Sequence, residues 1–222
     1  MTIRQRAVHA EDKHERHDAI LDAAQRLLTR APDRLASMAD VADEAGLAKG
    51  TVYLYFASKE ELLLALHERG IDAFFRGVIA RAEDRKSIAV ADVLALTREH
   101  MLAPPLFLPL ATRCFAAMAQ AVPSEAAQAF KSRMRARLAR AGASLERHFP
   151  ELGKGGGVGL LRHSYALVLG LWQLSAAPPP GDPDAFPTYP SGVDVAFGVD
   201  LERALCVLWS GTIASRDTQS RS

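Results

Sequence analysis

The sequence predicts an all-α fold in which a small N-terminal unit is joined by one long helix to a larger helical bundle. Apolar residues recur at helical spacing in one segment after another, and caps and breakers separate these segments. No series of strands and no internal repeat occurs in the sequence. With 222 residues, of which 49% are hydrophobic and 24% charged, the chain is long enough for a small domain plus a larger one.

The N-terminal end predicts an arm followed by a helix. Residues 1–15 are polar and charged, so a mobile arm is expected there. From residue 16 onward, apolar side chains fall on one face of a helix. Pro32 ends this helix, because proline has no amide hydrogen to donate to a further turn.

Two short helices are expected next. Ser37, followed three residues later by Asp40, has the pattern of a capping box and predicts a helix over 38–45. Gly46 suits the left-handed residue that follows a helix, because glycine has no Cβ to clash. The segment 49–56 is rich in β-branched and aromatic residues, which favour strands, yet it lies between helical segments.

A helical conformation resolves this conflict in 49–56. On a helix, Val52 and Phe56 lie one turn apart and point inward. Helix, glycine-containing turn and second short helix together form a helix-turn-helix. An outer face with hydroxyl groups and an ammonium group, which suits phosphate oxygens and base edges, is left to Lys49, Thr51, Tyr53 and Tyr55.

A long helix over 58–82 is expected to bridge the two predicted domains. Ser58 and Glu61 form a second capping box at its start. Its wide apolar face is long enough to leave one globular unit and enter another. The remaining predicted segments are helices over 88–102, 106–122, 124–149, 160–177 and 193–213, a loop over 153–159, a Pro-rich connection over 178–190 and a disordered tail over 217–222.

The stretch AGLAKGTVYLYFASKEELLLAL, residues 45–66, resembles the signature of the TetR family of bacterial transcriptional regulators. The close resemblance covers about residues 16–70. It implies a helix-turn-helix DNA-binding domain over 16–57 and a C-terminal ligand-binding and dimerisation domain over 58–216. It also implies a homodimer that places one helix of each subunit in successive major grooves of a palindromic double-stranded DNA operator, and a small-molecule effector that releases the DNA.

The resemblance also implies which residues contact DNA. The positions where the family contacts bases or nearby backbone are Lys49, Gly50, Thr51 and Tyr53. The positions where it contacts phosphate are Ser37, Tyr55 and Lys59. Lys59 lies in the first turn of the predicted long helix, whose free amides also favour an anion.

Two residues depart from the family pattern. Ala48 stands where many members carry serine, so the helix that follows lacks a side-chain N-cap. Leu54 stands where a polar or ring residue is usual. As a candidate DNA contact, Leu54 either meets a thymine methyl group or packs on its own domain.

The effector cavity has a set of candidate residues, because the resemblance implies that their helices surround it. For each of them, packing in the core is the more common role. Arg113 either pairs with an acid such as Glu99, or reaches the surface, or anchors an anionic or carbonyl effector. The candidates are Phe74, Phe75, Met101, Phe107, Arg113, Cys114, Phe115, Met118, Phe130 and Met134.

The last two predicted helices are more apolar than one chain requires. The resemblance implies that they pair with the same helices of a second subunit in a four-helix interface. Packing in a monomeric core is the alternative. The candidate interface residues are Leu167, Leu171, Trp172, Leu201, Leu205, Leu208 and Trp209.

Charge and motifs argue against several other functions. The net charge of +1 gives no global basic field, so any DNA binding must rest on local placement. HERH, residues 14–17, is not HExxH, and GKGGGVG matches neither common phosphate-binding loop. Cys114 and Cys206 have no histidine nearby in sequence, and the sequence predicts no catalytic residue, cofactor or metal.

The sequence thus predicts a ligand-responsive dimeric transcriptional regulator, a repressor released from its operator by a small, largely apolar effector. The alternatives are a DNA-binding regulator without a ligand and, less favoured, a helical enzyme. No signal peptide is recognised, and the longest apolar run, 165–177, is too short to span a bilayer. A cytoplasmic location without membrane contact is therefore expected.

Overall fold

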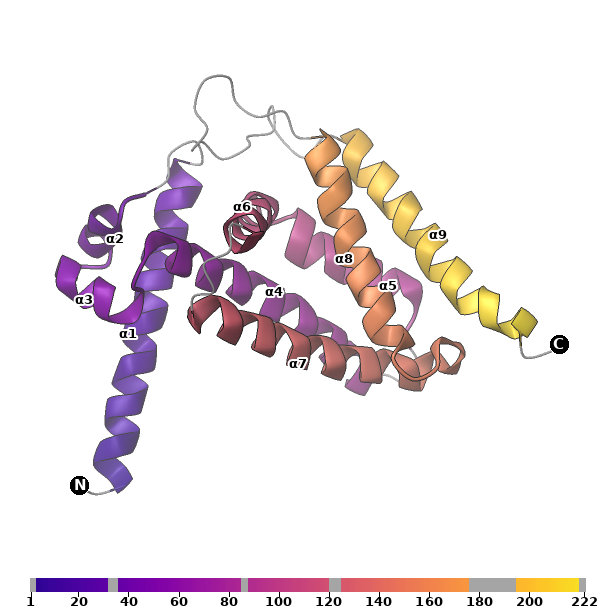
Figure 1. Cartoon of the computed structure of the whole chain (residues 1–222), viewed down its shortest axis with the longest axis horizontal. Helices are drawn as coiled ribbons and strands as arrows, with labels where there is room; N and C mark the ends of the chain where they lie inside the picture. The colour runs from indigo at the N-terminus through magenta and orange to yellow at the C-terminus, as the bar shows by residue number, and fades with distance from the viewer. Residues whose placement is uncertain (1–2, 32–35, 85–87, 120–124, 176–194, 220–222) are drawn as a thin grey trace.

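The computed structural model describes residues 3–31, 36–84, 88–119, 125–175 and 195–219, and the side chains of 12–31, 36–84, 88–114, 125–175 and 197–214. Every regular element in these residues is helical, which confirms the predicted all-α class. Figure 1 shows the helices in two groups that share α4. The elements are α1 (Ile3–Arg30), α2 (Met38–Glu44), α3 (Lys49–Tyr55), α4 (Lys59–Asp84), α5 (Val90–Thr97), the π-helix η1 (Arg98–Leu102), α6 (Phe107–Ala119), α7 (Glu125–His148), the 3-10 helix η2 (Pro150–Leu152), α8 (Gly156–Ser175) and α9 (Val195–Gln219).

The first group packs α1, α2, α3 and the start of α4 around one small core. Ile20 of α1, Val41 of α2 and Val52 of α3 are almost completely shielded from solvent in it. Leu106, directly before α6, and Leu110 of α6 complete this core. The N-terminal group therefore shares its core with the C-terminal bundle.

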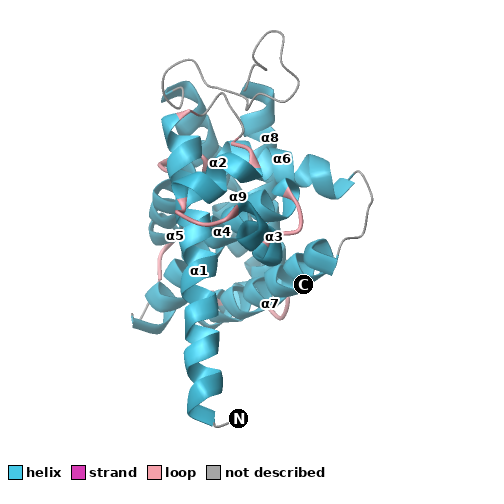
Figure 2. Cartoon of the chain, turned by 90° about the vertical axis from the view of Figure 1, so that its left-hand side faces the viewer, coloured by secondary structure: helices cyan, strands magenta, loops and turns pink. Residues whose placement is uncertain are grey.

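The beginning of α1 differs from the mobile arm predicted over 1–15, because the helix already starts at Ile3. This stretch has no apolar stripe, but it contains mostly good helix formers and no glycine or proline before Pro32. Extending an existing helix costs far less than nucleating one, so propensity suffices here without packing. Figures 1 and 2 show the first turns of α1 projecting away from the other helices.

α4 connects the two groups, as predicted. Near its start, Leu62 and Leu66 lie in the N-terminal core. Further along, Phe74 and Val78 lie in the larger core that α4 forms with α5, α6, α7, α8 and α9. In this bundle α7 packs along α4, α8 along α7 and α9 along α8. None of the helices in the described part of the chain is long and apolar enough to cross a membrane.

The helix predicted over 88–102 is divided in the structure. α5 ends at Thr97 and continues as the π-helix η1. The amide of Ala103 donates to the carbonyl of Arg98, five residues back, at 2.8 Å, which closes the wide turn. Pro104 follows directly, and it stops the helix because it has no amide hydrogen.

Two further boundaries differ from the prediction. The loop predicted over 153–159 is shorter, because α8 already begins at Gly156. The tail predicted over 217–222 is helical up to Gln219, the end of α9. The Pro-rich connection over 178–190 lies outside the described residues.

A close backbone contact explains why glycines form the first turn of α8. Gly157 of α8 lies against Gly142 of α7, and a Cβ on Gly142 would lie 2.7 Å from the amide nitrogen of Val158. The amide of Gly157 also donates to Oε1 of Glu146 at 3.0 Å. The two glycines therefore allow α7 and α8 to cross without intervening side chains, which closes one end of the bundle.

We expect Gly157→Ala to destabilise the protein by about 1–3 kcal/mol, because the new Cβ would collide with the backbone of Gly142. Gly159→Ala, in the same helix, is the matched control. A Cβ on Gly159 has nothing within 4 Å, so this variant should be neutral or more stable by about 0.5–1 kcal/mol. Urea unfolding measures both, and equal midpoints for the two variants would contradict the contact.

Candidate nucleic-acid interface and cavity

The turn between α2 and α3 is built as the sequence predicts. The amide of Asp40 donates to Ser37 Oγ at 3.2 Å, and the amide of Ser37 donates to Asp40 Oδ2 at 2.9 Å, so the capping box is complete. Gly46 has a φ of 67°, in the left-handed region that favours glycine. The amide of Leu47 then donates to the carbonyl of Ala42 at 2.9 Å. These bonds fix the angle at which α3 leaves α2.

α3 presents a mixed polar and apolar surface to solvent. Lys49 and Gly50 are exposed, and the Lys49 ammonium lies 6.0 Å from the centre of the Tyr53 ring. Tyr53 is 44% exposed and Leu54 84% exposed. The exposure of Leu54 decides between its two alternatives, because a side chain so open does not pack on its own domain. DNA contact by these residues stays a prediction.

The other predicted DNA contacts flank this surface. Thr51 and Tyr55 are half-buried at the sides of α3, and Tyr55 packs against the N-terminal core. Ser37 is exposed at the start of α2, and Lys59 is half-buried in the first turn of α4. The second capping box is also present, since the amide of Glu61 donates to the Ser58 hydroxyl at 3.1 Å. Ser37 and Lys59 therefore each lie at the start of a helix whose capping box is formed.

Ion pairs hold α2 and α4 against α1. Glu44, at the end of α2, accepts hydrogen bonds from Arg26 and Arg30 of α1 at 2.7 and 2.8 Å. These bonds hold the pKa of the Glu44 carboxyl below its usual value. Arg69 of α4 pairs with Asp22 of α1 at 2.5 Å. The position of α3 relative to α4 is therefore supported from the α1 side as well as by the core.

A cavity of about 330 Å³ lies in the second group, between α4, α5, η1, α7 and α8. Its wall is mostly apolar, with a few polar side chains from α5 and α8. Five predicted residues line it, namely Phe74, Phe75, Met101, Phe130 and Met134. Other lining residues, which the sequence did not single out, are Ile71, Thr97, Leu138, Leu161, Arg162, Ser164, Tyr165 and Val168.

Three predicted cavity residues lie elsewhere. Phe107 packs against His67, with ring centres 5.1 Å apart, and is not part of this wall. Cys114 is buried beside Leu64 and Phe130, and burial raises the pKa of its thiol to about 12. Arg113 is half-buried on α6 and is not among the residues that line this cavity, so the role of effector anchor stays a prediction for it. The side chains of the remaining two candidates, Phe115 and Met118, lie outside the described residues.

One hydrogen bond joins the cavity wall to α4. His67 Nε2 lies 3.0 Å from the hydroxyl of Tyr165, a cavity residue of α8. His67 is 2% exposed, and burial lowers its pKa from 6.5 to about 4, so the ring is neutral at pH 7. Burial also raises the pKa of the Tyr165 hydroxyl. Because His67 Nδ1 is buried without a hydrogen-bond partner, the bond to Tyr165 is the one polar contact recorded for the imidazole in the described structure.

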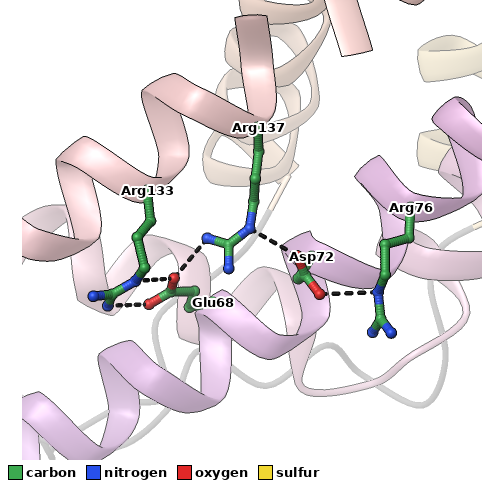
Figure 3. A network of polar contacts seen from close by, with 5 residues as sticks. All are labelled: Glu68, Asp72, Arg76, Arg133 and Arg137. Carbon is green, nitrogen blue, oxygen red and sulfur yellow. Dashed lines mark hydrogen bonds and ion pairs between the residues drawn. The ribbon is translucent and has the colours of Figure 1, made fainter. Parts of the chain in front are cut away.

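A second polar cluster joins α4 to α7 (Figure 3). Arg133 donates two bonds of 2.6 Å to the Glu68 carboxylate. Arg137 bridges Glu68 at 2.6 Å and Asp72 at 2.7 Å, and Asp72 also pairs with Arg76 at 2.9 Å. Burial opposes ionisation of Glu68, but the hydrogen bonds from the two arginines of α7 outweigh it and lower its pKa. The carboxylates therefore hold α7 against α4 next to the cavity.

The predicted interface residues of the last two helices mostly serve the core of one chain. The side chains of Trp172, Leu201, Leu205 and Trp209 are 4% exposed or less within a single protomer. They are therefore core residues of a single chain, where α8 packs against α7 and α9, and α9 packs against α5 and η2. The subunit contact predicted for them stays a prediction. The other three candidates, Leu167, Leu171 and Leu208, are half-buried at the edge of this core.

The outward faces of α8 and α9 carry other apolar residues. Leu174 is 86% exposed, Val207 68% and Val199 52%. Cys206 is exposed on α9 beside Val207.

Among the described residues, no group of three His, Cys, Asp or Glu side chains lies close enough to hold a metal ion.

Comparison with protein families identifies the group to which this fold belongs. The model for bacterial regulatory proteins of the tetR family matches residues 20–66, and the model for the tetracyclin repressor-like C-terminal domain matches residues 68–216. The chain belongs to the TetR family of bacterial transcriptional regulators. The boundary between the two TetR models falls inside α4, which is the helix that both cores share.

Individual relatives resemble the N-terminal part. An uncharacterized HTH-type transcriptional regulator, YfiR of Bacillus subtilis, is 40% identical over 76 residues, which is 34% of this chain and 37% of that protein. The Fatty acid metabolism regulator protein of Bacillus subtilis is 31% identical over 81 residues, which is 36% of this chain and 40% of that protein. The chain thus matches about two fifths of the length of these curated relatives.

Solved structures share the fold of the whole chain. A candidate transcriptional regulator from Rhodococcus sp. RHA1 has a TM-score of 0.57 at 16% identity, with 89% of this chain and 98% of that chain covered. A candidate TetR-family regulator from Mesorhizobium loti has a TM-score of 0.54 at 17% identity, with 91% and 96% covered. At such low identity the likeness extends to the TetR fold and not to a ligand or an operator.

The two short helices offer a test of capping. Ala48, at the N-cap of α3, has extended backbone angles but makes no side-chain cap, so Ala48→Ser should stabilise the protein by about 0.5–1 kcal/mol. Ser37→Ala should destabilise it by about 1 kcal/mol, because the amide of Asp40 loses its acceptor. Thermal and urea unfolding measure both. A stability loss on Ala48→Ser would show that the α3 N-terminus is not free to accept a cap.

The depressed pKa of His67 predicts a loss of stability in acid. The folded pKa lies below the unfolded one, so the unfolded state binds the proton more tightly and stability falls as the pH drops from 6.5 towards about 4. Between about pH 7.5 and about pH 4.5, the wild type should lose roughly 2–3 kcal/mol more than His67→Gln. Urea unfolding at each pH measures this. His163→Gln, at an exposed position of α8, is the control and should follow the wild type. Parallel curves for wild type and His67→Gln would contradict a buried neutral imidazole.

Proposed function

We propose that the protein is a dimeric DNA-binding transcriptional regulator that inserts α3 of each subunit into the major groove of its operator. The observation that carries this proposal is the outer face of α3, where Lys49, Tyr53 and Leu54 lie exposed on a helix whose other face is fixed in the core. Helix-turn-helix proteins read base edges with a helix presented in this way. The capped starts of α2 and α4, where Ser37 and Lys59 lie, supply groups for the flanking phosphates.

The proposed regulator is a repressor that a small effector releases from DNA. Family membership supports this role, and the cavity of about 330 Å³ has the size and apolar lining of a small-molecule site. α4 supplies Phe74 and Phe75 to the cavity wall and Lys59 to the flank of the DNA-contact surface. A ligand that favours one tilt of α4 would therefore change the separation of the two recognition helices in the dimer.

The subunit contact proposed here differs from the one predicted from sequence. It uses the outward faces of α8 and α9, on which Leu174, Val199 and Val207 are exposed. An exposed apolar strip along two adjacent helices suits an isologous contact, in which the same two helices of a second copy complete a four-helix arrangement. The half-buried Leu167, Leu171 and Leu208 lie at the edge of this face.

Binding to DNA from the protein's own promoter region tests the proposal. Wild-type protein should bind in fluorescence anisotropy with an affinity that falls steeply with added salt, because phosphate contacts release counterions. Leu54→Ala should weaken specific binding roughly fivefold, equivalent to about 1 kcal/mol, if its side chain meets a thymine methyl group. Its stability should be unchanged, since Leu54 is 84% exposed.

Two controls separate this contact from general effects. Leu54→Met keeps an apolar side chain of similar size and should bind within about twofold of the wild type. Binding of Leu54→Ala to unrelated DNA should be unaltered, because that binding rests on phosphates alone. Wild-type protein that shows no salt-dependent binding to its promoter region at low ionic strength would overturn the proposed function.

A further inference from the structure

We propose that the effector of this cavity is an amphiphilic anion, whose apolar chain fills the cavity and whose acidic head binds Arg162. The inference rests on the proposed function, because it assigns a chemical class to the ligand of the same site. It assigns to Arg162 of α8 the anchoring role that the sequence suggested for Arg113.

The interior of the cavity favours an apolar chain, because the polar groups of its wall are already engaged. The Thr97 hydroxyl donates to the carbonyl of Val93 at 2.9 Å. The Ser164 hydroxyl donates to the carbonyl of Leu160 at 2.8 Å and accepts from Trp209 Nε1 at 2.9 Å. A polar ligand group placed inside would have to break one of these bonds or remain unpaired, and both are costly.

The third polar group inside is the hydroxyl of Tyr165, which is held by His67 of α4. The remaining wall consists of aromatic, aliphatic and thioether side chains. Methionines such as Met101 and Met134 adapt to irregular apolar chains, because their side chains are flexible and polarizable. The wall therefore suits a chain that is flexible and lacks hydrogen-bonding groups along its length.

The edge of the cavity has a positive charge for which the described residues show no acidic partner. Arg162 is the one charged residue among the described side chains that line the cavity, and none of those side chains is acidic. Several other arginines of the bundle are paired, as Arg81 is with Asp92 at 2.8 Å and Arg137 with Asp72 at 2.7 Å. For Arg162 the described structure records no hydrogen bond and no ion pair.

The exposure of Arg162 fits the head-group role. A guanidinium group inside an apolar cavity would need a partner at all times, whereas one at the edge remains hydrated until a ligand arrives. Guanidinium binds a carboxylate or a phosphate through two parallel hydrogen bonds, which gives both affinity and orientation. The head group then stays at the surface while the chain extends inward towards Phe74 and Met101.

Three probes with the same alkyl chain test this assignment by isothermal titration calorimetry: decanoate, decyl phosphate and decanol, each below the concentration at which it aggregates. Wild-type protein should bind at least one of the two acids about tenfold more tightly than the alcohol. The two acids distinguish a carboxylate head from a phosphate head. In Arg162→Gln the advantage of the acids should fall to about twofold or less, while the affinity for the alcohol should be unchanged.

Arg135→Gln is the matched control, since Arg135 is an exposed arginine of α7 that does not line the cavity, and it should keep the preference for the acid. Three results would overturn the inference: no binding of either acid, equal binding of acid and alcohol by the wild type, or an acid preference that survives in Arg162→Gln. Promoter binding by the same preparations reports separately on the proposed function. Decanol binding without a preference for the acids would support an apolar ligand in the cavity and would contradict an anionic head group at Arg162.

Discussion

The burial of α4 along its length is the constraint on which the rest of the structure depends. Leu62 and Leu66 belong to the core of the N-terminal group, and Phe74 and Val78 belong to the core of the bundle. A helix is stiff over this length, so its two ends do not move independently. A change in the packing around Phe74 is therefore transmitted to the place where α4 meets α1, and the position of the N-terminal group follows from the packing of the bundle.

Polar contacts determine which neighbouring helix moves together with α4. Glu68 and Asp72 are tied to Arg133 and Arg137 of α7, so α4 and α7 form a joined pair. Between α8 and α4, the hydrogen bond recorded among the described residues joins Tyr165 to His67. A pair with several charged hydrogen bonds separates less readily than one held by a neutral bond and apolar contacts. The contact between α4 and α8 is thus the more adaptable wall of the cavity.

Local sequence signals predicted the helix-turn-helix well, because caps and turns depend on residues a few positions apart. Ser37 with Asp40, Gly46 and the inward Val52 all take their predicted roles. Predictions that require knowledge of which helix faces meet are harder to make from sequence. Trp172 and Trp209 are core residues because α8 and α9 pack on the same chain, and Arg162, not Arg113, is among the residues that line the cavity. Apolar residues in a sequence indicate that a helix face is buried, but they do not indicate whether the same chain or a second subunit covers that face.

In the proposed regulator, the hydrogen bond between Tyr165 and His67 links ligand binding in the cavity to the position of α4. A ligand shifts an equilibrium only by the difference between its affinities for the two states. Tyr165 lines the cavity and its partner lies on α4, so a chain that fits beside Tyr165 in one tilt of α4 fits less well in another. Linkage makes this coupling reciprocal, and DNA that holds α4 in the opposite tilt must weaken ligand binding by the same factor. Because His67 is buried and its Nδ1 has no partner in the described structure, loss of the bond to Tyr165 would leave the imidazole without a recorded hydrogen bond. That cost disfavours arrangements intermediate between two positions of α4.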